Sequence, residues 1–212
     1  CHIVLEGVNV VKGFYENLSG IYVPEGATLT ISGTGSLDAS SNGLGAGIGG
    51  GYEVDCGNIV IEGGTVKATG GEESAGIGSA SYSSAGNITI SGGTVIAVGG
   101  DYAAGIGSGG AGIVGNITIS GNNTKVTAIK GNYAPYSIGE GDSYDEEFDD
   151  PRIGDITIGD VQTPGIVSSL FAYPFGQWTV AFNANGGSGE MTSQTVDIEP
   201  ELILNGNSFT RE

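Results

Sequence analysis

The chain has 212 residues, of which 42 are glycine, about three times the usual share. Its 6 Lys and Arg stand against 24 Asp and Glu, and this net charge of −18 would repel the phosphate backbone of nucleic acids. No apolar run reaches the roughly 18 residues that cross a bilayer, so we expect no membrane insertion. Two cysteines and one histidine are too few for a disulfide framework or the usual zinc site.

A repeat with a period of 29 residues runs through most of the chain. The segment GNIVIEGGTVKA begins at Gly57, GNITISGGTVIA begins at Gly86, and GNITISG begins at Gly115. Degraded copies of the opening strand flank these three at residues 1–6, 27–32 and 154–159. Together they predict about five and a half coils of a repeat protein.

Within one repeat, apolar residues alternate with period two: Ile88 and Ile90 share one face and Thr89 takes the other. The repeat has no 3.6-residue stripe, which excludes helix. Three short strands separated by glycine turns fit a coil of a parallel β-solenoid, with equivalent strands stacked about 4.8 Å apart. The predicted inward rows are Leu29, Ile59, Ile88, Ile117, Ile156; Ile31, Ile61, Ile90, Ile119, Ile158; Leu37, Val66, Val95, Val126; Ala39, Ala68, Ala97, Ala128; and Ile48, Ile77, Ile106, Ile138.

The second half of each repeat carries the motif AGIG, at Ala46, Ala75 and Ala104, with a degraded copy at Tyr136. Because this motif has almost no side chain beyond its isoleucine, we expect a thin, tightly wound side of the solenoid. The glycine pairs at residues 63–64 and 92–93 predict sharp turns, often with positive φ. A β-propeller is the structural alternative, although its blades need about 40 residues.

These motifs resemble the glycine-rich, right-handed β-helix repeats of large secreted or wall-attached surface proteins of Gram-positive gut bacteria. The resemblance implies an extracellular location, at the bacterial cell surface or attached to the cell wall. It also implies a carbohydrate-binding solenoid, so we expect an adhesive or carbohydrate-binding module whose partner would be a polysaccharide or a host glycan. We therefore expect a piece of a longer surface protein.

The repeat ends near Pro164, and we expect the solenoid to cover residues 1–176 and a partial module to cover 177–212. Aromatic residues between Leu170 and Trp178 are predicted to cap the open end of the stack. Residues 178–196 resemble the start of an internalin-type B repeat, which implies a short β-grasp-like segment.

An acidic insertion with seven carboxylates lies between Glu140 and Asp150. We expect a solvated loop there, and a Ca²⁺ site is the alternative because carboxylate oxygens are the ligands that Ca²⁺ prefers. The ligands would come from Asp142, Asp145, Glu146, Glu147, Asp149 and Asp150.

Five tyrosines lie in loops around the AGIG motifs, where exposed rings could stack on sugars. Tyr82, Tyr102, Tyr133 and Tyr136 are the candidate ligand-binding residues; Tyr52 lies in the same kind of loop. The tyrosines do not share one register, so scattered loop residues are the competing interpretation.

We expect no enzymatic activity. A β-helix polysaccharide lyase would have to use Arg152, the one arginine beside the acidic insertion, and a hydrolase would have to use Asp155 and Asp160, which flank one strand. A catalytic triad would depend on His2, the only histidine. Two further alternatives remain: an ice-binding surface on the outward threonine row that includes Thr89 and Thr118, and a purely structural stalk.

The two thiols, Cys1 and Cys56, are predicted at equivalent corners two coils apart, about 9.6 Å by the strand spacing. This exceeds the Cα separation that a disulfide allows, so we expect both thiols to be free. The sequence does not predict an oligomeric state.

Overall fold

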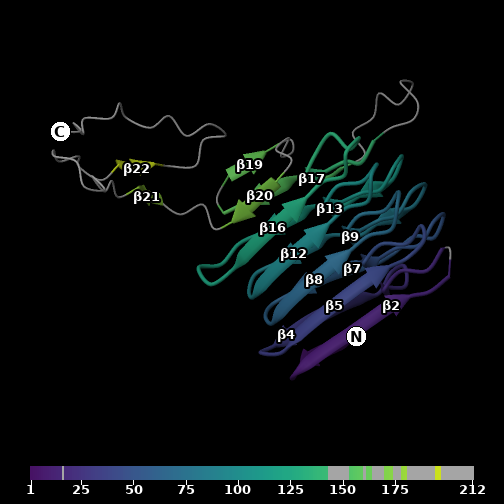
Figure 1. Cartoon of the computed structure of the whole chain (residues 1–212), viewed down its shortest axis with the longest axis horizontal. Helices are drawn as coiled ribbons and strands as arrows, with labels where there is room; N and C mark the ends of the chain where they lie inside the picture. Colours follow the sequence, from purple (N-terminus) through teal and green to yellow (C-terminus); the bar gives the residue numbers. More distant parts are fainter. Residues whose placement is uncertain are drawn as a thin grey trace, which may run out of the picture. The chain divides into compact units, whose positions relative to one another are not determined.

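The computed structural model describes residues 1–15, 17–142 and 153–159, together with the backbone of four later strands. The chain divides into two compact units, Cys1–Tyr173 and Pro174–Glu212. The first unit is an all-β parallel solenoid, and Figure 1 shows its coils stacked in chain order from the N-terminus. No helix in the described part of the chain is long and apolar enough to span a bilayer.

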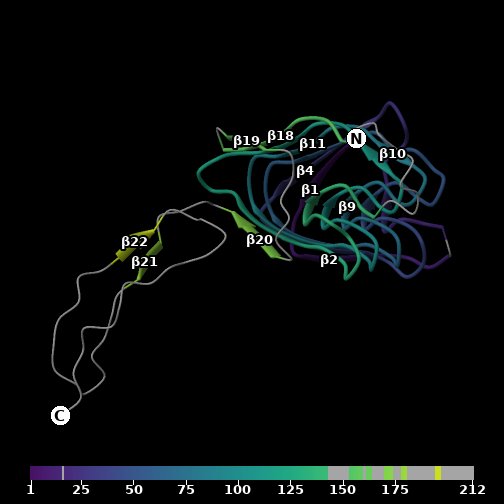
Figure 2. The same ribbon diagram turned by 90° about the horizontal axis from the view of Figure 1, so that it is seen from above.

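Each coil contributes one strand to each of three parallel sheets, and five coils are complete. Viewed along the stack, strands of one sheet lie behind one another (Figure 2). The first sheet contains β1 (His2–Leu5), β4 (Thr28–Gly33), β7 (Asn58–Ile61), β11 (Ile88–Ile90), β15 (Ile117–Ile119) and β18 (Ile156–Ile158). The second contains β2 (Val8–Gly13), β5 (Ser36–Ser41), β8 (Thr65–Thr69), β12 (Thr94–Val98) and β16 (Lys125–Ile129). The third contains β3 (Ile21–Tyr22), β6 (Ile48–Gly49), β9 (Ile77–Gly78), β13 (Ile106–Gly107) and β17 (Ile138–Gly139). Two further short strands, β10 (Ser84–Ala85) and β14 (Ile113–Val114), pair in parallel; each lies in the connection from a third-sheet strand to the first-sheet strand of the next coil.

The strand register confirms the predicted repeat. Ile88 pairs with Ile59 on one side and Ile117 on the other, each 29 residues away, and Ile117 pairs with Ile156 across the insertion. All five predicted inward rows align in this way. The parallel pairing also excludes the antiparallel blades of a propeller.

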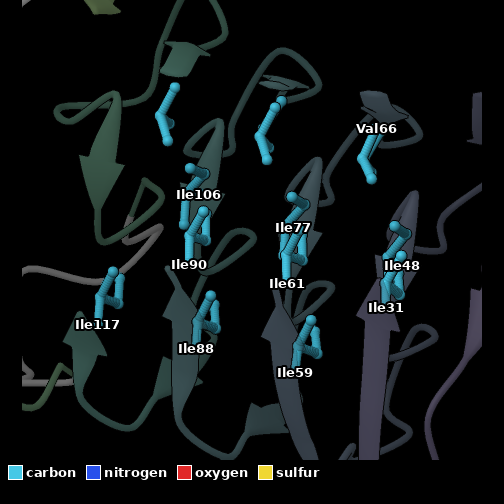
Figure 3. Packing of buried hydrophobic residues seen from close by; sticks show 14 of the residues in the cluster. Ile31, Ile48, Ile59, Ile61, Val66, Ile77, Ile88, Ile90, Ile106 and Ile117 are labelled. Atoms are coloured by element: carbon cyan, nitrogen blue, oxygen red, sulfur yellow. The ribbon is translucent and has the colours of Figure 1, made fainter. Parts of the chain in front are cut away.

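The isoleucine rows form the core of the solenoid. Figure 3 shows Ile59, Ile88 and Ile117 in one row, with Ile61 and Ile90 in the next. All five side chains are fully buried. Burial of one such side chain stabilises the fold by roughly 1.5–3 kcal/mol relative to exposure. One coil alone could not bury these residues, so stacking and folding are the same event.

Glycine is required where the coils approach most closely. Gly78 has φ of +134°, and a Cβ atom there would lie 1.9 Å from the carbonyl oxygen of Gly107. Gly49 and Gly107 repeat this clash with the next coil. The coils therefore stack closely along the AGIG side. In the glycine pairs the second member has the positive φ, +81° at Gly64 and +82° at Gly93.

Asparagine side chains form a second, polar ladder along the stack. The Oδ1 atom of Asn58 accepts a hydrogen bond from the backbone N–H of Asn87, at 2.8 Å. The Oδ1 atom of Asn87 accepts in the same way from the N–H of Asn116, and that of Asn116 accepts from the N–H of Asp155. The asparagine in each GNI segment therefore ties its coil to the following one.

The two ends of the stack differ. β19 (Val161–Thr163) pairs antiparallel with β18, and β20 (Leu170–Tyr173) pairs antiparallel with β16. Antiparallel strands end the parallel stack, and β20 covers the edge of β16 as the predicted cap would. In the first coil, by contrast, Val8 and Val10 point outward, with 84% and 61% of their surface exposed.

The second unit is described only at β21 (Trp178–Val180) and β22 (Gln194–Val196), which pair antiparallel. The rest of residues 178–196, on which the internalin-type resemblance depends, lies outside the described residues.

Candidate functional site: the turn face

The AGIG motif brings two turns of each coil together. The backbone N–H of Ala75 donates to the carbonyl oxygen of Ser79, at 3.1 Å, and Ala104 donates to Ser108 in the same way. The chain thus enters and leaves the motif at neighbouring points. Glu73, before the motif, links the two sides: its carbonyl oxygen accepts from the Ser81 hydroxyl, at 2.8 Å, and from the N–H of Gly110 in the next coil, at 3.2 Å.

We call the resulting surface the turn face. It consists of the turns before the motif, residues 72–74, 101–103 and 132–134, and the turns after it, residues 51–55, 80–84 and 109–112. Residues that lie on opposite sides of the motif in the sequence therefore share one surface.

Four tyrosines form two ring pairs on the turn face. Tyr52 and Tyr82 contact edge to face, with ring centroids 5.8 Å apart and an interplanar angle of 75°. Tyr102 and Tyr133 are stacked, with centroids 4.8 Å apart and an angle of 18°. The stacked spacing equals the strand spacing, because each ring follows its own coil. Tyr82 and Tyr133 expose 52% and 62% of their surface.

Carboxylates lie near both tyrosine pairs. The pKa of Tyr52 is raised by partial burial and by the charges of Glu53 and Glu73. The pKa of Tyr102 is raised by partial burial and by its neighbours, which include Asp101, Glu72 and Glu73. The backbone contacts place the two pairs at the same turn: the Glu73 carbonyl oxygen accepts from Ser81, next to Tyr82, and the N–H of Tyr102 donates to the carbonyl oxygen of Glu72, at 3.5 Å.

The backbone is strained at one position of the turn face. Glu53, Tyr82 and Ala111 occupy equivalent places in three successive coils, and their φ values are 53°, 54° and 52°. This left-handed conformation costs a residue with a side chain roughly 1–2 kcal/mol. Such outliers cluster at functional sites, where the surrounding structure holds them.

Three of the four predicted ligand-binding residues, Tyr82, Tyr102 and Tyr133, lie on the turn face. The fourth, Tyr136, occupies the place of a buried alanine of the AGIG motif, and its ring lies against Gly139. Tyr52 also belongs to the turn face, as its loop position indicated.

The four carboxylates, Glu53, Glu72, Glu73 and Asp101, were not predicted as site residues. For Glu72 and Asp101 the available signal was their 29-residue spacing, one position before Glu73 and Tyr102.

Asp142 is the second carboxylate of the acidic insertion, and its backbone contacts the turn face. Its N–H donates to the carbonyl oxygen of Tyr102, at 2.7 Å, and its carbonyl oxygen accepts from Ala111, at 2.8 Å. The other predicted Ca²⁺ ligands lie outside the described residues: Asp145, Glu146, Glu147, Asp149 and Asp150. Among the described residues, no group of three His, Cys, Asp or Glu side chains could hold a metal ion. Ca²⁺ binding stays a prediction.

The structure describes only some of the residues on which the enzymatic and ice-binding alternatives depend. Arg152 and Asp160 lie outside the described residues. His2 contacts the hydroxyl of Ser32, 2.8 Å from its Nε2 atom, in an exposed position on the first coils. The outward row of the ice-binding alternative is aligned between Thr89 and Thr118, but Val60 interrupts it.

The fold and the repeat define the class: this chain is a β-helix repeat protein. A family model described as "Beta helix repeat" matches residues 29–52, 59–81 and 88–113. These segments correspond to the second, third and fourth coils, and each of them includes one strand of each of the three sheets and an AGIG motif. Neither the curated proteins nor the solved structures contain a match to the chain.

Proposed function

We propose that this chain is a non-enzymatic, carbohydrate-binding module of an extracellular bacterial surface protein, and that the turn face binds the glycan. The observation that carries the proposal is the gathering of two tyrosine pairs and four carboxylates on one surface. Tyrosine rings bind the apolar faces of sugars, and carboxylate oxygens accept hydrogen bonds from hydroxyl groups. The resemblance of the repeat to those of bacterial surface proteins supports the location.

The arrangement of the tyrosines favours an extended ligand. Tyr52, Tyr82, Tyr102 and Tyr133 come from four consecutive coils, one ring from each. Three steps of the coil spacing place the first and the last about 14 Å apart along the stack. A chain of several sugars that runs along the solenoid would contact both pairs, whereas a single sugar would contact one.

A glycan array tests the proposal, with the intact chain and the variants Tyr102→Ala and Tyr133→Ala. We expect the intact chain to bind at least one glycan and both variants to lose most of that signal. Val10→Ala is the control, because Val10 is 61% exposed on β2 of the second sheet, outside the turns that make up the turn face. An array without any signal, or a signal that survives both substitutions, would count against the proposal.

A stalk is the second candidate, and the uninterrupted ladders support it. If the chain only separates other domains, whole coils are interchangeable. Deletion of residues 86–114 joins Ala85 to Gly115, which repeats the natural junction of Ala85 and Gly86. If the chain is a stalk, this shortened chain should fold, and glycan binding should be absent both before and after the deletion. If the chain is a glycan-binding module, the shortened chain should fold but lose the glycan binding of the intact chain.

An enzyme would give a different result from both. A β-helix lyase predicts turnover of an acidic polysaccharide in the presence of Ca²⁺, abolished by Arg152→Ala. The proposal predicts no product from any acidic polysaccharide, with or without Ca²⁺, after prolonged incubation.

A further inference from the structure

The charged side chains beside the tyrosine pairs are mainly negative. Glu53, Glu72, Glu73 and Asp101 contribute four carboxylates to the turn face. Among the described residues, the first three form no ion pair, and Asp101 accepts a hydrogen bond from the neutral side chain of Asn132, at 3.0 Å. The face therefore combines aromatic rings with an excess of negative charge.

The described lysines do not neutralise it. Lys12 and Lys125 lie on strands of the second sheet, and Lys67 pairs with Asp38 on that sheet, at 3.4 Å. Lys130 does reach the turn face, where its ammonium group donates to the carbonyl oxygen of Ala134, but this single positive charge stands against four carboxylates and forms no ion pair with them. The local charge thus has the same sign as the net charge of −18.

This combination selects among glycans. An anionic polysaccharide is repelled by the carboxylates and by the whole chain. A neutral glycan gains stacking and hydrogen bonds only. An ammonium group gains charge-assisted hydrogen bonds to carboxylates and a favourable contact with tyrosine faces.

We infer that the turn face prefers a saccharide chain that carries free amino groups, such as an oligomer of glucosamine. The inference rests on the proposed function and specifies its ligand class. The edge-to-face pair beside Glu53 and Glu73 and the stacked pair beside Glu72 and Asp101 are the two places where ammonium groups bind.

Titration calorimetry with three hexasaccharides tests the inference: glucosamine, N-acetylglucosamine and galacturonic acid. At about pH 6, amino groups are protonated and carboxylates are ionised. We expect the glucosamine oligomer to bind at least about tenfold more tightly than its acetylated counterpart, and the galacturonic acid oligomer not to bind. Raising NaCl from about 0.05 M to about 0.5 M weakens the first interaction severalfold.

Two double variants separate the turn face from the general acidity of the chain. Glu72→Gln with Glu73→Gln removes two charges from the turn face and is expected to weaken glucosamine binding about tenfold. Glu6→Gln with Glu62→Gln removes two exposed charges at the corner between the first and second sheets, and is expected to leave binding unchanged. Unchanged melting temperatures would show that both variants are folded.

The outcomes distinguish the inference from the proposed function. Equal binding of the acetylated oligomer, or equal weakening by the two double variants, overturns the inference and leaves tyrosine-dependent glycan binding in place. The inference also fails if no hexasaccharide binds while the array gives a tyrosine-dependent signal for another glycan. If neither experiment detects binding, the proposed function fails with it.

Discussion

The side-chain Oδ1 atom of Asn87 lies 2.9 Å from the backbone nitrogen of Asn116, one coil further along the stack, and accepts its hydrogen bond. Asn58 makes the same contact with Asn87, at 2.8 Å. Every GNI segment therefore carries the acceptor for the next one. This explains why asparagine precedes the first core isoleucine in three successive coils.

Asn87→Ala is expected to lower the free energy of unfolding by about 1 kcal/mol, because the N–H of Asn116 loses its partner. Asn87→Asp keeps an acceptor oxygen at the same place and is expected to cost less than half as much. Urea denaturation of the two variants measures the difference. Equal losses would mean that the bond across the coils contributes nothing and that the side chain acts in another way.

The register predicts unequal effects for two isoleucines of the fourth coil. Ile90 is fully buried in the core, whereas Ile96 points outward and is half-buried. Ile90→Ala is expected to cost about 2–5 kcal/mol because it leaves a cavity. Ile96→Ala is expected to cost about 1 kcal/mol or less. Chemical denaturation of both variants under the same conditions checks the order, and the reverse order would contradict the inward rows.

Gly78 and Gly26 both have positive φ, +134° and +72°, but only Gly78 is crowded. A Cβ atom at Gly26 has nothing within 4 Å. Gly26→Ala is therefore expected to cost about 1 kcal/mol from backbone strain alone. Gly78→Ala adds a clash with the Gly107 carbonyl and is expected to cost about 3 kcal/mol or more. Comparable melting temperatures for the two variants would show that the coils can separate without penalty.

Both thiols are free, as predicted, but they differ in exposure: Cys1 is exposed and Cys56 is buried. Burial, followed by the charge of Asp55, raises the pKa of Cys56 from 9.0 to about 12, although a hydrogen bond with the Gly86 backbone acts in the opposite direction. At about pH 8, a thiol reagent is expected to label Cys1 quickly and Cys56 only after unfolding.

The raised pKa also makes stability depend on pH. The folded state holds the Cys56 proton more tightly than the unfolded state, so its contribution is complete below pH 9.0 and is lost as the pH rises toward about 12. Between about pH 8 and about pH 10, the free energy of unfolding should therefore fall more steeply for the intact chain than for Cys56→Ala. Parallel slopes would rule out this linkage.

The core could be predicted from the sequence because the 29-residue period identifies the equivalent residues of successive coils. Once Ile59, Ile88 and Ile117 are recognised as equivalent, their alternation with outward residues places them inside, and their strands must stack in parallel. The 29-residue spacing does not hold in the first coil, where paired residues such as His2 and Thr30 are 28 positions apart. Cys1 aligns with Leu29, since His2 pairs with Thr30, whereas Cys56 precedes Ile59 by three residues. The two cysteines therefore do not occupy equivalent corners.

The turn face could not be predicted in the same way. The period identifies neighbours along the stack, such as Tyr102 and Tyr133, but not neighbours across one coil. Tyr82 and Glu73 share a surface because the backbone hydrogen bond from Ala75 to Ser79 brings the two ends of the AGIG segment together. A backbone hydrogen bond of this kind does not depend on a particular side chain, so the sequence does not reveal it. The left-handed φ of Tyr82 and Ala111 was hidden for a related reason, because neither residue is glycine.

The hydrogen bonds between coils lie parallel to the stacking direction, and this has a mechanical consequence. A force that pulls the two ends of the solenoid apart loads these bonds like a zipper, a few at a time, rather than in shear. Each released coil of 29 residues lengthens the tether by up to about 100 Å. Stretching a single molecule should give a series of small, evenly spaced rips, so under tension the protein would lengthen coil by coil and absorb load gradually.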